Sequence, residues 1–321
     1  MRPATLPRDR ARAVIAWTLV VPGALWTLIR LSGLELGFPL APAMNYTPYV
    51  LPVAVLATSV AALLHQWPAT ALAGVTSLAL FLLIWPRMAG GPDEDVHGRP
   101  LSVMSANVLR GGSDVERLLE LARRYDAEVL ALQELTPDFT RQFEGEGGAE
   151  LFPHKLLKLR RGVSGNGLYS RFPLRRVPVA EPQTHLLFAE MDVAPGIGLE
   201  VASVHPLAPL DAGNIAGWRR GLENLPKADP DGPMRVLLGD FNAGFDNPEF
   251  RDVVHSGYED AAEQMGDGLQ ATWPTRDKPF HFLPVTIDHV LFDARVGVRS
   301  FETFELLDSD HRGIQAELVV P

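Results

Sequence analysis

Three long apolar runs occupy most of the first ninety residues, and they constrain the fold more than any other feature. The runs lie at about residues 14–31, 49–65 and 69–87. The first is interrupted only by polar Thr18, Thr27 and Arg30. An α-helix needs about 20 apolar residues to cross the hydrocarbon core of a bilayer, and each run is near that length. The sequence therefore predicts three transmembrane helices, of which the last two form a tight hairpin.

Two other interpretations of these runs are open. Three apolar helices could form the buried core of a soluble protein, although stretches with almost no charge argue against it. The first run could instead be a cleaved signal peptide, because Ala41-Pro42-Ala43 resembles a small-residue cleavage site. That site lies about ten residues past the run, which is farther than in a usual signal peptide.

The arginines at the N-terminus predict the orientation. Arg2, Arg8, Arg10 and Arg12 precede the first run, and positively charged flanks stay in the cytoplasm. Three crossings then leave the remainder of the chain outside. We therefore expect a multi-pass protein of the cell membrane with an extracytoplasmic domain. Its parts would be an anchor (residues 1–90), a linker rich in Gly and Pro (91–100) and a large folded domain (101–321).

The two parts differ in charge. The first ninety residues carry six arginines against one aspartate and one glutamate, whereas the whole chain has a net charge of −10. The domain is therefore strongly acidic and should bind polyanions poorly, since affinity for nucleic acid comes largely from Lys and Arg. The chain has no Cys, which excludes disulfides, thiolate metal sites and a cysteine nucleophile.

The segment RVLLGDFN, residues 235–242, is the most informative stretch of the domain. An apolar run typical of a buried strand ends at Gly239, and Asp240 and Asn242 follow. Residues two apart share one face of an extended chain. An anionic acceptor beside a neutral amide suits a site that holds a phosphate oxygen and a nucleophilic water together. The alternative is a strand followed by an Asx turn.

Polar residues end several other expected strands. Asn107 follows an alternating run, Glu134 follows an apolar one, and His205 ends the second strand of an expected hairpin with Pro195-Gly196 at its turn. Each alone fits a simpler role, as a turn residue, a rim carboxylate or a surface histidine. A hard cation such as Mg²⁺ prefers one or two carboxylates together with waters and substrate oxygens, and Glu134 suits that role.

Two Asp-His dipeptides lie near the C-terminus. Asp288 and His289 interrupt the apolar run VTIDHVLF, and Asp310 and His311 precede a final strand. A buried aspartate needs a partner, and Asp288 could orient the imidazole of His311. Asp310 could share a metal ion with Glu134.

Two other stretches bear on the site. Trp273, in ATWP, is expected on a loop near it. The basic run at 154–161 is either a solvated sheet edge, which we favour, or an attractor for anions.

The motifs SANV, QE, LYSRFP, a strand-end His, GDFN, IDH and SDH, in this order, resemble those of the endonuclease/exonuclease/phosphatase family, the DNase I-like fold. The resemblance covers residues 101–321. It implies an α/β (α+β) fold, a four-layer αββα sandwich in which helices cover two face-to-face sheets. It also implies phosphoester hydrolysis that depends on Mg²⁺ or Mn²⁺. The three-span layout resembles membrane-anchored bacterial members, the VanJ-like proteins.

The resemblance also implies residue roles. A metal site would consist of Asn107, Glu134 and Asp310. Asp240 and Asn242 match the residues that position the water and the phosphate. Asp288 and His311 match the Asp–His pair that acts on the scissile phosphate, and His205 matches a second histidine. The family often has an Arg before the Ile of IDH, where this chain has Thr286, and the sequence identifies no carboxylate partner for His205.

Fold does not settle the substrate. A tethered, acidic domain outside a membrane favours lipid-linked or other envelope phosphoesters or pyrophosphates, hydrolysed by in-line attack of water. An extracytoplasmic nuclease is the alternative, and it would need a groove lined by the basic run. A non-catalytic binding module on the same fold is the third possibility, and the filled metal and histidine positions argue against it. No protein partner is expected.

Overall fold

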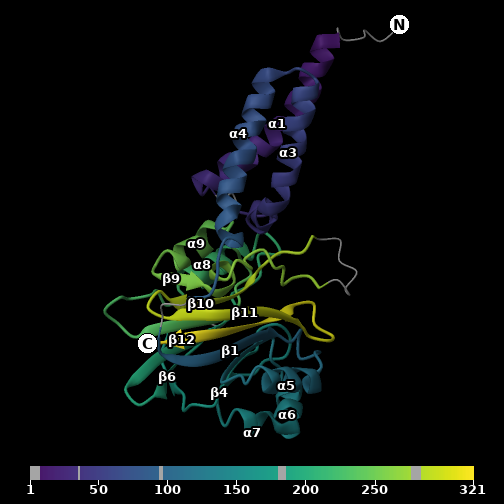
Figure 1. The fold of residues 1–321 in the computed structure, drawn as a ribbon. Coiled ribbons are helices and arrows are strands. Elements are labelled where there is room, and N and C mark those ends of the chain that lie inside the picture. The colour runs from purple at the N-terminus through teal and green to yellow at the C-terminus, as the bar shows by residue number, and fades with distance from the viewer. Residues whose placement is uncertain (1–7, 35–36, 94–96, 180–185, 276–282) are drawn as a thin grey trace.

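Three long helices stand on a two-sheet domain (Figure 1). The computed structural model describes residues 8–34, 37–93, 97–179, 186–275 and 283–321. The long helices are α1 (Arg8–Ser32), α3 (Thr47–Leu63) and α4 (Trp67–Ile84). Short segments follow α1 and α4: α2 (Leu40–Ala43), η1 (Met44–Tyr46) and η2 (Trp85–Met88). The described part of the chain therefore contains the three predicted helices, within a few residues of the predicted bounds.

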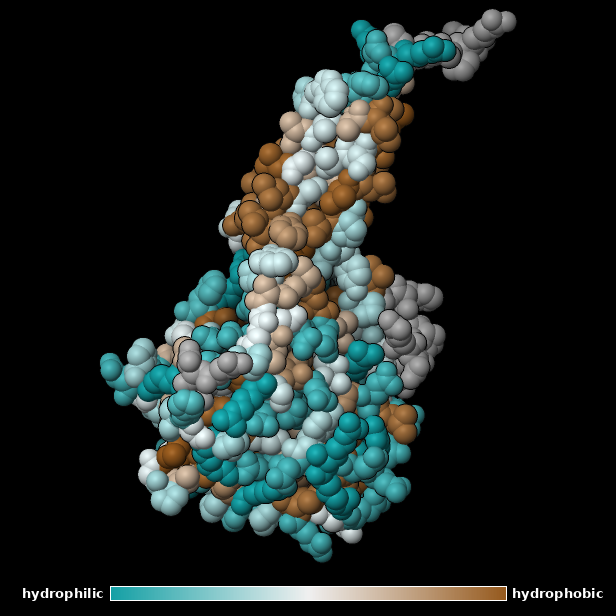
Figure 2. All heavy atoms as spheres, in the orientation of Figure 1, coloured by the Kyte–Doolittle hydropathy of each residue, from teal (hydrophilic) through white to brown (hydrophobic). Residues whose placement is uncertain are grey.

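Three helical stretches are long and apolar enough to cross a membrane: Arg8–Ser32, Leu40–Leu63 and Trp67–Met88. Figure 2 shows hydrophobic surface along them, in contrast to the mostly hydrophilic domain below. Pro48 and Pro68 lie in the first turns of α3 and α4, where a missing backbone N–H removes no helical bond. Between these two helices, His65 adopts a positive φ of 58°, which ends α3 and reverses the chain into the predicted hairpin.

The domain contains two six-stranded mixed sheets. The strand order of the first sheet is β11 (Gly297–Glu305), β12 (Arg312–Val320), β1 (Arg99–Asn107), β2 (Val129–Gln133), β4 (Asn166–Ser170) and β3 (His154–Lys158). The order of the second is β5 (Arg175–Arg176), β6 (Leu186–Ala194), β7 (Ile197–Val204), β8 (Met234–Asp240), β10 (Asp288–Asp293) and β9 (Tyr258–Asp260). Each sheet has one parallel pair among its described strands, β1–β2 and β7–β8.

Helices cover the outer face of each sheet. On the first sheet lie α5 (Val115–Arg124), α6 (Pro137–Phe143), the π-turn η3 (Glu144–Gly148) and α7 (Ala149–Leu151). On the second lie α8 (Ile215–Glu223) and α9 (Pro248–Val254), and α10 (Ala261–Gln264) packs near β10 and β11. A third apolar core, which includes Val103, Val201 and Leu238, fills the space between the sheets. The four-layer αββα prediction is confirmed.

Local sequence signals account for several of these elements. Asp114 caps α5 by accepting a hydrogen bond from the Arg117 N–H at 2.8 Å. Gly196 takes a positive φ of 80° in the turn of the β6–β7 hairpin. The basic run begins in β3, the outermost strand of its sheet, where Lys155 pairs with Glu144. The run therefore starts at a sheet edge, and its role as a solvated edge stays a prediction.

The predicted linker at 91–100 is partly built into the domain. β1 begins at Arg99, because Arg99 and Pro100 already pair with the last residues of β12. Upstream, the Gly91 N–H donates to the Gln264 carbonyl at 2.8 Å, and the Asp93 N–H donates to the Val298 carbonyl at 2.9 Å. The main chain after α4 is therefore held against the domain before the first strand starts.

Candidate active site

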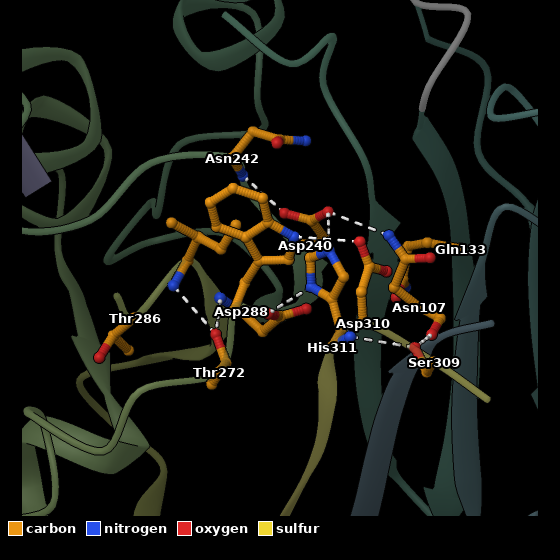
Figure 3. Close-up of polar contacts among 12 residues, drawn as sticks. Asn107, Gln133, Asp240, Asn242, Thr272, Thr286, Asp288, Ser309, Asp310 and His311 are labelled. Atoms are coloured by element: carbon orange, nitrogen blue, oxygen red, sulfur yellow. Dashed lines mark hydrogen bonds and ion pairs between the residues drawn. The ribbon is translucent and has the colours of Figure 1, made fainter. Parts of the chain in front are cut away.

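The two parallel strand pairs bring the candidate residues to one edge of the sandwich. Parallel neighbours end at the same edge of a sheet, and the register pairs Asn107 with Gln133 and Val204 with Gly239. The first residues beyond these pairs include Glu134 and His205. Because the sheets face each other, strand ends from both halves of the domain meet in one place (Figure 3).

Asp240, the last residue of β8, lies at the centre of this cluster. Its carboxylate accepts hydrogen bonds from the Asn242 N–H at 2.8 Å and from the Asn107 side-chain amide at 3.1 Å. The Nε2 atoms of His205 and His311 lie 3.6 Å and 3.7 Å from its Oδ2. Burial raises the pKa of Asp240, against the opposing charge of His311. The Asx turn considered from the sequence is therefore present, and it fixes a carboxylate that two imidazoles also approach.

Gly239 permits this arrangement through its lack of a side chain. Its φ is +151°, and an added Cβ would lie 2.0 Å from the Val204 carbonyl oxygen of the neighbouring strand. No larger residue fits at that distance, so the glycine of GDFN lets β7 and β8 end side by side with His205 and Asp240 adjacent.

His311 is oriented by Asp288. The Nδ1 atom of His311 lies 2.9 Å from Asp288 Oδ2, which directs Nε2 towards Asp240. The Asp288 N–H donates to the Thr272 hydroxyl at 3.1 Å, and Ser309 Oγ accepts from the His311 N–H at 3.1 Å. Burial lowers the pKa of His311, but the carboxylates of Asp288 and Asp240 outweigh it and raise the pKa. An imidazolium fixed in this way can stabilise negative charge or deliver a proton.

Glu134 follows β2 and Asp310 precedes β12, so both lie at the same sheet edge as Asn107. Glu134 Oε1 accepts from the Asn107 amide at 3.4 Å, and Oε2 accepts from the Arg110 N–H at 2.9 Å. Burial raises the pKa of Glu134, and the negative charge of Asp310 adds a smaller contribution. Asp310 Oδ2 accepts from the Trp273 indole at 3.2 Å, so Trp273 lies at the site as expected. Figure 3 shows Asp310 beside Asn107 and Asp240.

Two groups of residues could hold a cation. Asp240, Asp288 and His311 offer ligand atoms within 4.8 Å of one another, but Asp288 and His311 already face each other in a hydrogen bond. The described oxygens of the Glu134 and Asp310 carboxylates each accept a single hydrogen bond. Lone pairs therefore remain on them for ligation of a metal ion. A hard divalent cation prefers such oxygen ligands. The donor chemistry therefore fits Mg²⁺ or Mn²⁺ best at Glu134 and Asp310.

A network of buried polar side chains lies beside the site, and the sequence did not predict it. Ser105, Gln133, Asn166 and Ser203 are all essentially buried, and they connect the two sheets. Gln133 bonds to Ser105 and donates to Ser203 at 3.3 Å, and the Asn166 amide donates to the Ser203 carbonyl at 3.0 Å. Buried polar groups need such partners. The Gln of the QE motif was the available signal, but its partners come from distant strands.

Two of the singled-out residues point elsewhere. Thr286, at the position where the resemblance leads us to expect Arg, donates to the Gln270 carbonyl at 2.9 Å and lies apart from the cluster (Figure 3). His289 is buried between Asp260 Oδ2, at 2.9 Å from its Nδ1, and the Ala243 carbonyl, at 3.0 Å from its Nε2. His289 therefore supports the fold, although it adjoins Asp288 in the sequence.

Comparison with protein families and solved structures agrees with this fold. Residues 104–311 match the model described as the Endonuclease/Exonuclease/phosphatase family. A humanized D. rerio TDP2 with 14 mutations is 20% identical, with a TM-score of 0.54 over 68% of this chain and 98% of that one.

Two bacterial structures are similar to the same extent. An endonuclease/exonuclease/phosphatase from Beutenbergia cavernae is 20% identical, with a TM-score of 0.53 over 69% of this chain and 72% of that one. A 3'-5' exonuclease (NExo) from Neisseria meningitidis is 17% identical, with a TM-score of 0.53 over 68% and 100%. The search of curated proteins finds no significant match.

Proposed function

The chain belongs to the endonuclease/exonuclease/phosphatase family, and from this membership we propose a membrane-tethered, metal-dependent phosphoesterase that uses in-line attack by water. Hydrolysis of phosphoester bonds follows from the family. One observation supports the mechanism above the others. A buried carboxylate, Asp240, lies within 3.7 Å of the Nε2 atoms of His205 and His311, beside a pair of carboxylates suited to a cation.

Each residue around the substrate has a proposed role. Asp240 orients the attacking water and accepts its proton, since burial raises the pKa of this carboxyl. His311, held by Asp288, presents Nε2 to the charge that develops on the phosphoryl oxygens. His205 contributes a second imidazole, whose Nε2 lies 3.6 Å from the same Asp240 oxygen. Asn242 orients Asp240 through its backbone N–H, and its side-chain amide donates to the Pro206 carbonyl at 3.1 Å.

Glu134 and Asp310 would hold Mg²⁺ or Mn²⁺, with Asn107 bonded to Glu134 at 3.4 Å. When bound, the ion neutralises phosphate charge and stabilises the leaving oxygen. The Arg110 N–H and the Trp273 indole restrict these two carboxylates to one orientation each. The protein thereby fixes the ligands before the substrate arrives.

The proposed location is the cell membrane, with the catalytic domain outside the cytoplasm. Residues 1–90 form the anchor, 91–100 the connection and 101–321 the catalytic domain. The Arg8 end of α1 lies far from the domain (Figure 1), and Arg8, Arg10 and Arg12 cluster there. Positive flanks remain in the cytoplasm, so three crossings place the domain on the other side.

Apolar side chains at the mouth of the site support a lipid-linked substrate. Among the described residues after Met88, the exposed large apolar side chains are Val163, Leu210, Leu283 and Leu307. They lie in the β3–β4 loop, after β7, before β10 and in the β11–β12 loop, which all adjoin the strand ends of the site. Side chains in these loops would contact the apolar part of a lipid-linked substrate. Such a rim suits a phosphoester or pyrophosphate that carries a hydrocarbon chain.

A nuclease is the second candidate. The basic run continues from β3 into the loop at the site edge, where the Arg160 N–H donates to the Leu135 carbonyl, one residue beyond Glu134. One similar structure is described as D. rerio TDP2 complexed with a single-strand DNA product, and another as NExo bound to a product DNA hairpin. Cations at this edge would contact a nucleic-acid backbone.

The test uses the full chain in detergent micelles with Mg²⁺ or Mn²⁺. Its substrates are a lipid pyrophosphate, a phosphodiester lipid and plasmid DNA, and Asp240→Asn is the inactive control. We expect hydrolysis of a lipid by the wild type only. Leu210→Ser should slow the lipid reaction while leaving a short soluble phosphoester unaffected. Faster hydrolysis of DNA would favour the nuclease, and no hydrolysis of any substrate would overturn the proposal.

A further inference from the structure

The N-terminal helices and the domain meet at a buried ion cluster. Arg30 lies near the end of α1, Arg87 lies in η2, and Asp246 lies in the loop after β8. Arg30 Nε is 2.7 Å from Asp246 Oδ1, and Arg87 donates to both carboxylate oxygens at 2.8 Å. All three side chains are at most 7% exposed. Although burial opposes it, Arg87 and Arg30 hold the pKa of Asp246 below its ordinary value.

The loop held by this cluster is the one that leaves Asp240. It runs through Asn242 to Asp246 and Asn247. The Phe245 carbonyl also accepts from Arg30 at 2.7 Å, and the Asn247 amide donates to the Ala41 carbonyl at 2.7 Å. The described part of the N-terminal segment therefore bonds to three successive residues of the loop, three to five positions after Asn242.

A second contact reaches the other strand of the site. The Tyr49 hydroxyl, from α3, donates to the Pro284 carbonyl at 2.6 Å, just before the segment that leads into Asp288. Between these contacts lies a cavity of about 210 Å³ with Tyr49, Asp246 and Thr286 in its lining. Packing at the junction is therefore incomplete, and charged hydrogen bonds do more of the positioning there.

We propose that Arg30, Arg87 and Asp246 are positioning residues of the active site, so that the N-terminal helices complete the catalytic unit as well as anchor it. This inference rests on the proposed phosphoesterase function. Buried pairs are weak evidence for stability but can select one conformation. Here that conformation places Asn242 against Asp240, in a reaction where a displacement of about 1 Å costs roughly 100-fold in rate.

The chain offers a matched control at the other end of β10. Asp293 is also 3% exposed, and Arg295 donates to its two oxygens at 2.7 Å and 2.8 Å. Asp293→Asn thus breaks a two-bond Arg–Asp pair in the same domain, away from the site. It removes one buried carboxylate charge, as Asp246→Asn does, without touching the loop after β8, although its partner Arg295 is more exposed than Arg30 and Arg87.

The experiment compares Asp246→Asn, Arg87→Lys and Asp293→Asn in the full chain in micelles, below the melting temperature of each. The substrate is bis(p-nitrophenyl) phosphate with Mn²⁺. We expect Asp246→Asn to lower kcat about tenfold or more with little change in KM. Arg87→Lys should lower kcat less than Asp246→Asn does, because it keeps the positive charge and loses only the bidentate hydrogen bond. Asp293→Asn should lower only the melting temperature.

Hydrogen exchange of peptides over residues 239–250 provides a readout independent of activity. Exchange should rise in Asp246→Asn and stay unchanged in Asp293→Asn. If kcat and exchange in Asp246→Asn match those of Asp293→Asn, the positioning role is overturned. If the wild type cleaves no phosphoester, the proposed function fails, and the exchange difference still decides whether the cluster orders the loop.

Discussion

The helical segment and the sheet domain bury opposite kinds of side chain. Between α1, α3 and α4 the buried residues are mostly small, such as Ala16, Ala61 and Ala73, whereas Leu56 and Val75 point outward. In the domain, Trp218 and Phe241 are buried, and most of the surface is hydrophilic (Figure 2). Small residues allow helices to approach closely in lipid, where no hydrophobic force drives association. This contrast is what a membrane-spanning segment attached to a water-exposed domain would show.

The junction between these regions combines both designs. It has the buried charges of a soluble protein, in Arg30, Arg87 and Asp246, although two of the three come from the apolar segment. The comparison therefore predicts that the domain carries out the chemistry and that the helices anchor the chain in the membrane. Both regions should determine the conformation of the loop after β8. The following substitutions test that division, from the largest expected effect to the smallest.

His311→Ala should lower kcat/KM by about 10²–10⁴-fold, the range expected for loss of a general acid or base. His311 lies in the sheet domain, so the substitution leaves the N-terminal helices unchanged. Membrane extraction and helical content should therefore match the wild type. His255→Ala, at an exposed position of the domain, is the control. Activity of His311→Ala within threefold of the wild type would remove the imidazole from the mechanism.

Leu130→Ala, in the buried strand β2, should destabilise the domain by about 2–5 kcal/mol, because it leaves a cavity. The opposite change should harm the helices: Ala61→Leu overpacks their interface and should cost about 1–3 kcal/mol. Leu56→Ala, on the outward face of α3, is the control for both. Denaturation of each variant in micelles measures its free energy of unfolding. Equal stability of the Ala61→Leu and Leu56→Ala variants would contradict close packing of small residues between the helices.

Val75→Arg places a charge at the middle of α4 on an outward-facing position. A charge at the centre of a spanning helix costs about 2.5–3.5 kcal/mol on insertion scales, so the inserted fraction should fall. The same change at the exposed Leu210 of the domain should alter stability by no more than about 0.5 kcal/mol. Alkaline extraction of membranes measures the difference, and full insertion of Val75→Arg would argue against a lipid-facing α4.

Glu263→Gln should produce the smallest effect, and one that depends on pH. Burial, reinforced by the charge of Asp260, raises the pKa of Glu263 from 4.5 to about 7. The folded state therefore holds this proton more tightly than the unfolded state, and stability falls as pH rises between these two values. The variant should melt roughly 2–4 °C higher than the wild type at pH 8 and show no gain at pH 4. α3 and α4 contain no carboxylate, so this dependence belongs to the domain.

Much of this architecture follows from local patterns. Runs without charge predicted the three helices, because helix length in a bilayer depends only on composition over about 20 residues. The order of the motifs, through its resemblance to the family, predicted that Asn107, Glu134 and Asp240 belong to one site. The need of a buried aspartate for a partner indicated that Asp288 and His311 could pair, and their atoms lie 2.9 Å apart.

Other features depend on contacts that no local pattern encodes. The sequence left His205 without a carboxylate neighbour, and the register of β7 beside β8 supplies Asp240. Arg30 looked only like an interruption in an apolar run, yet it bonds to a residue 216 positions away. The apolar runs by themselves determined that three helices are long and apolar enough to cross a membrane, because this depends only on neighbouring residues. Tertiary structure alone decided which buried charges meet, because desolvated ions require partners that only the folded topology can bring within reach.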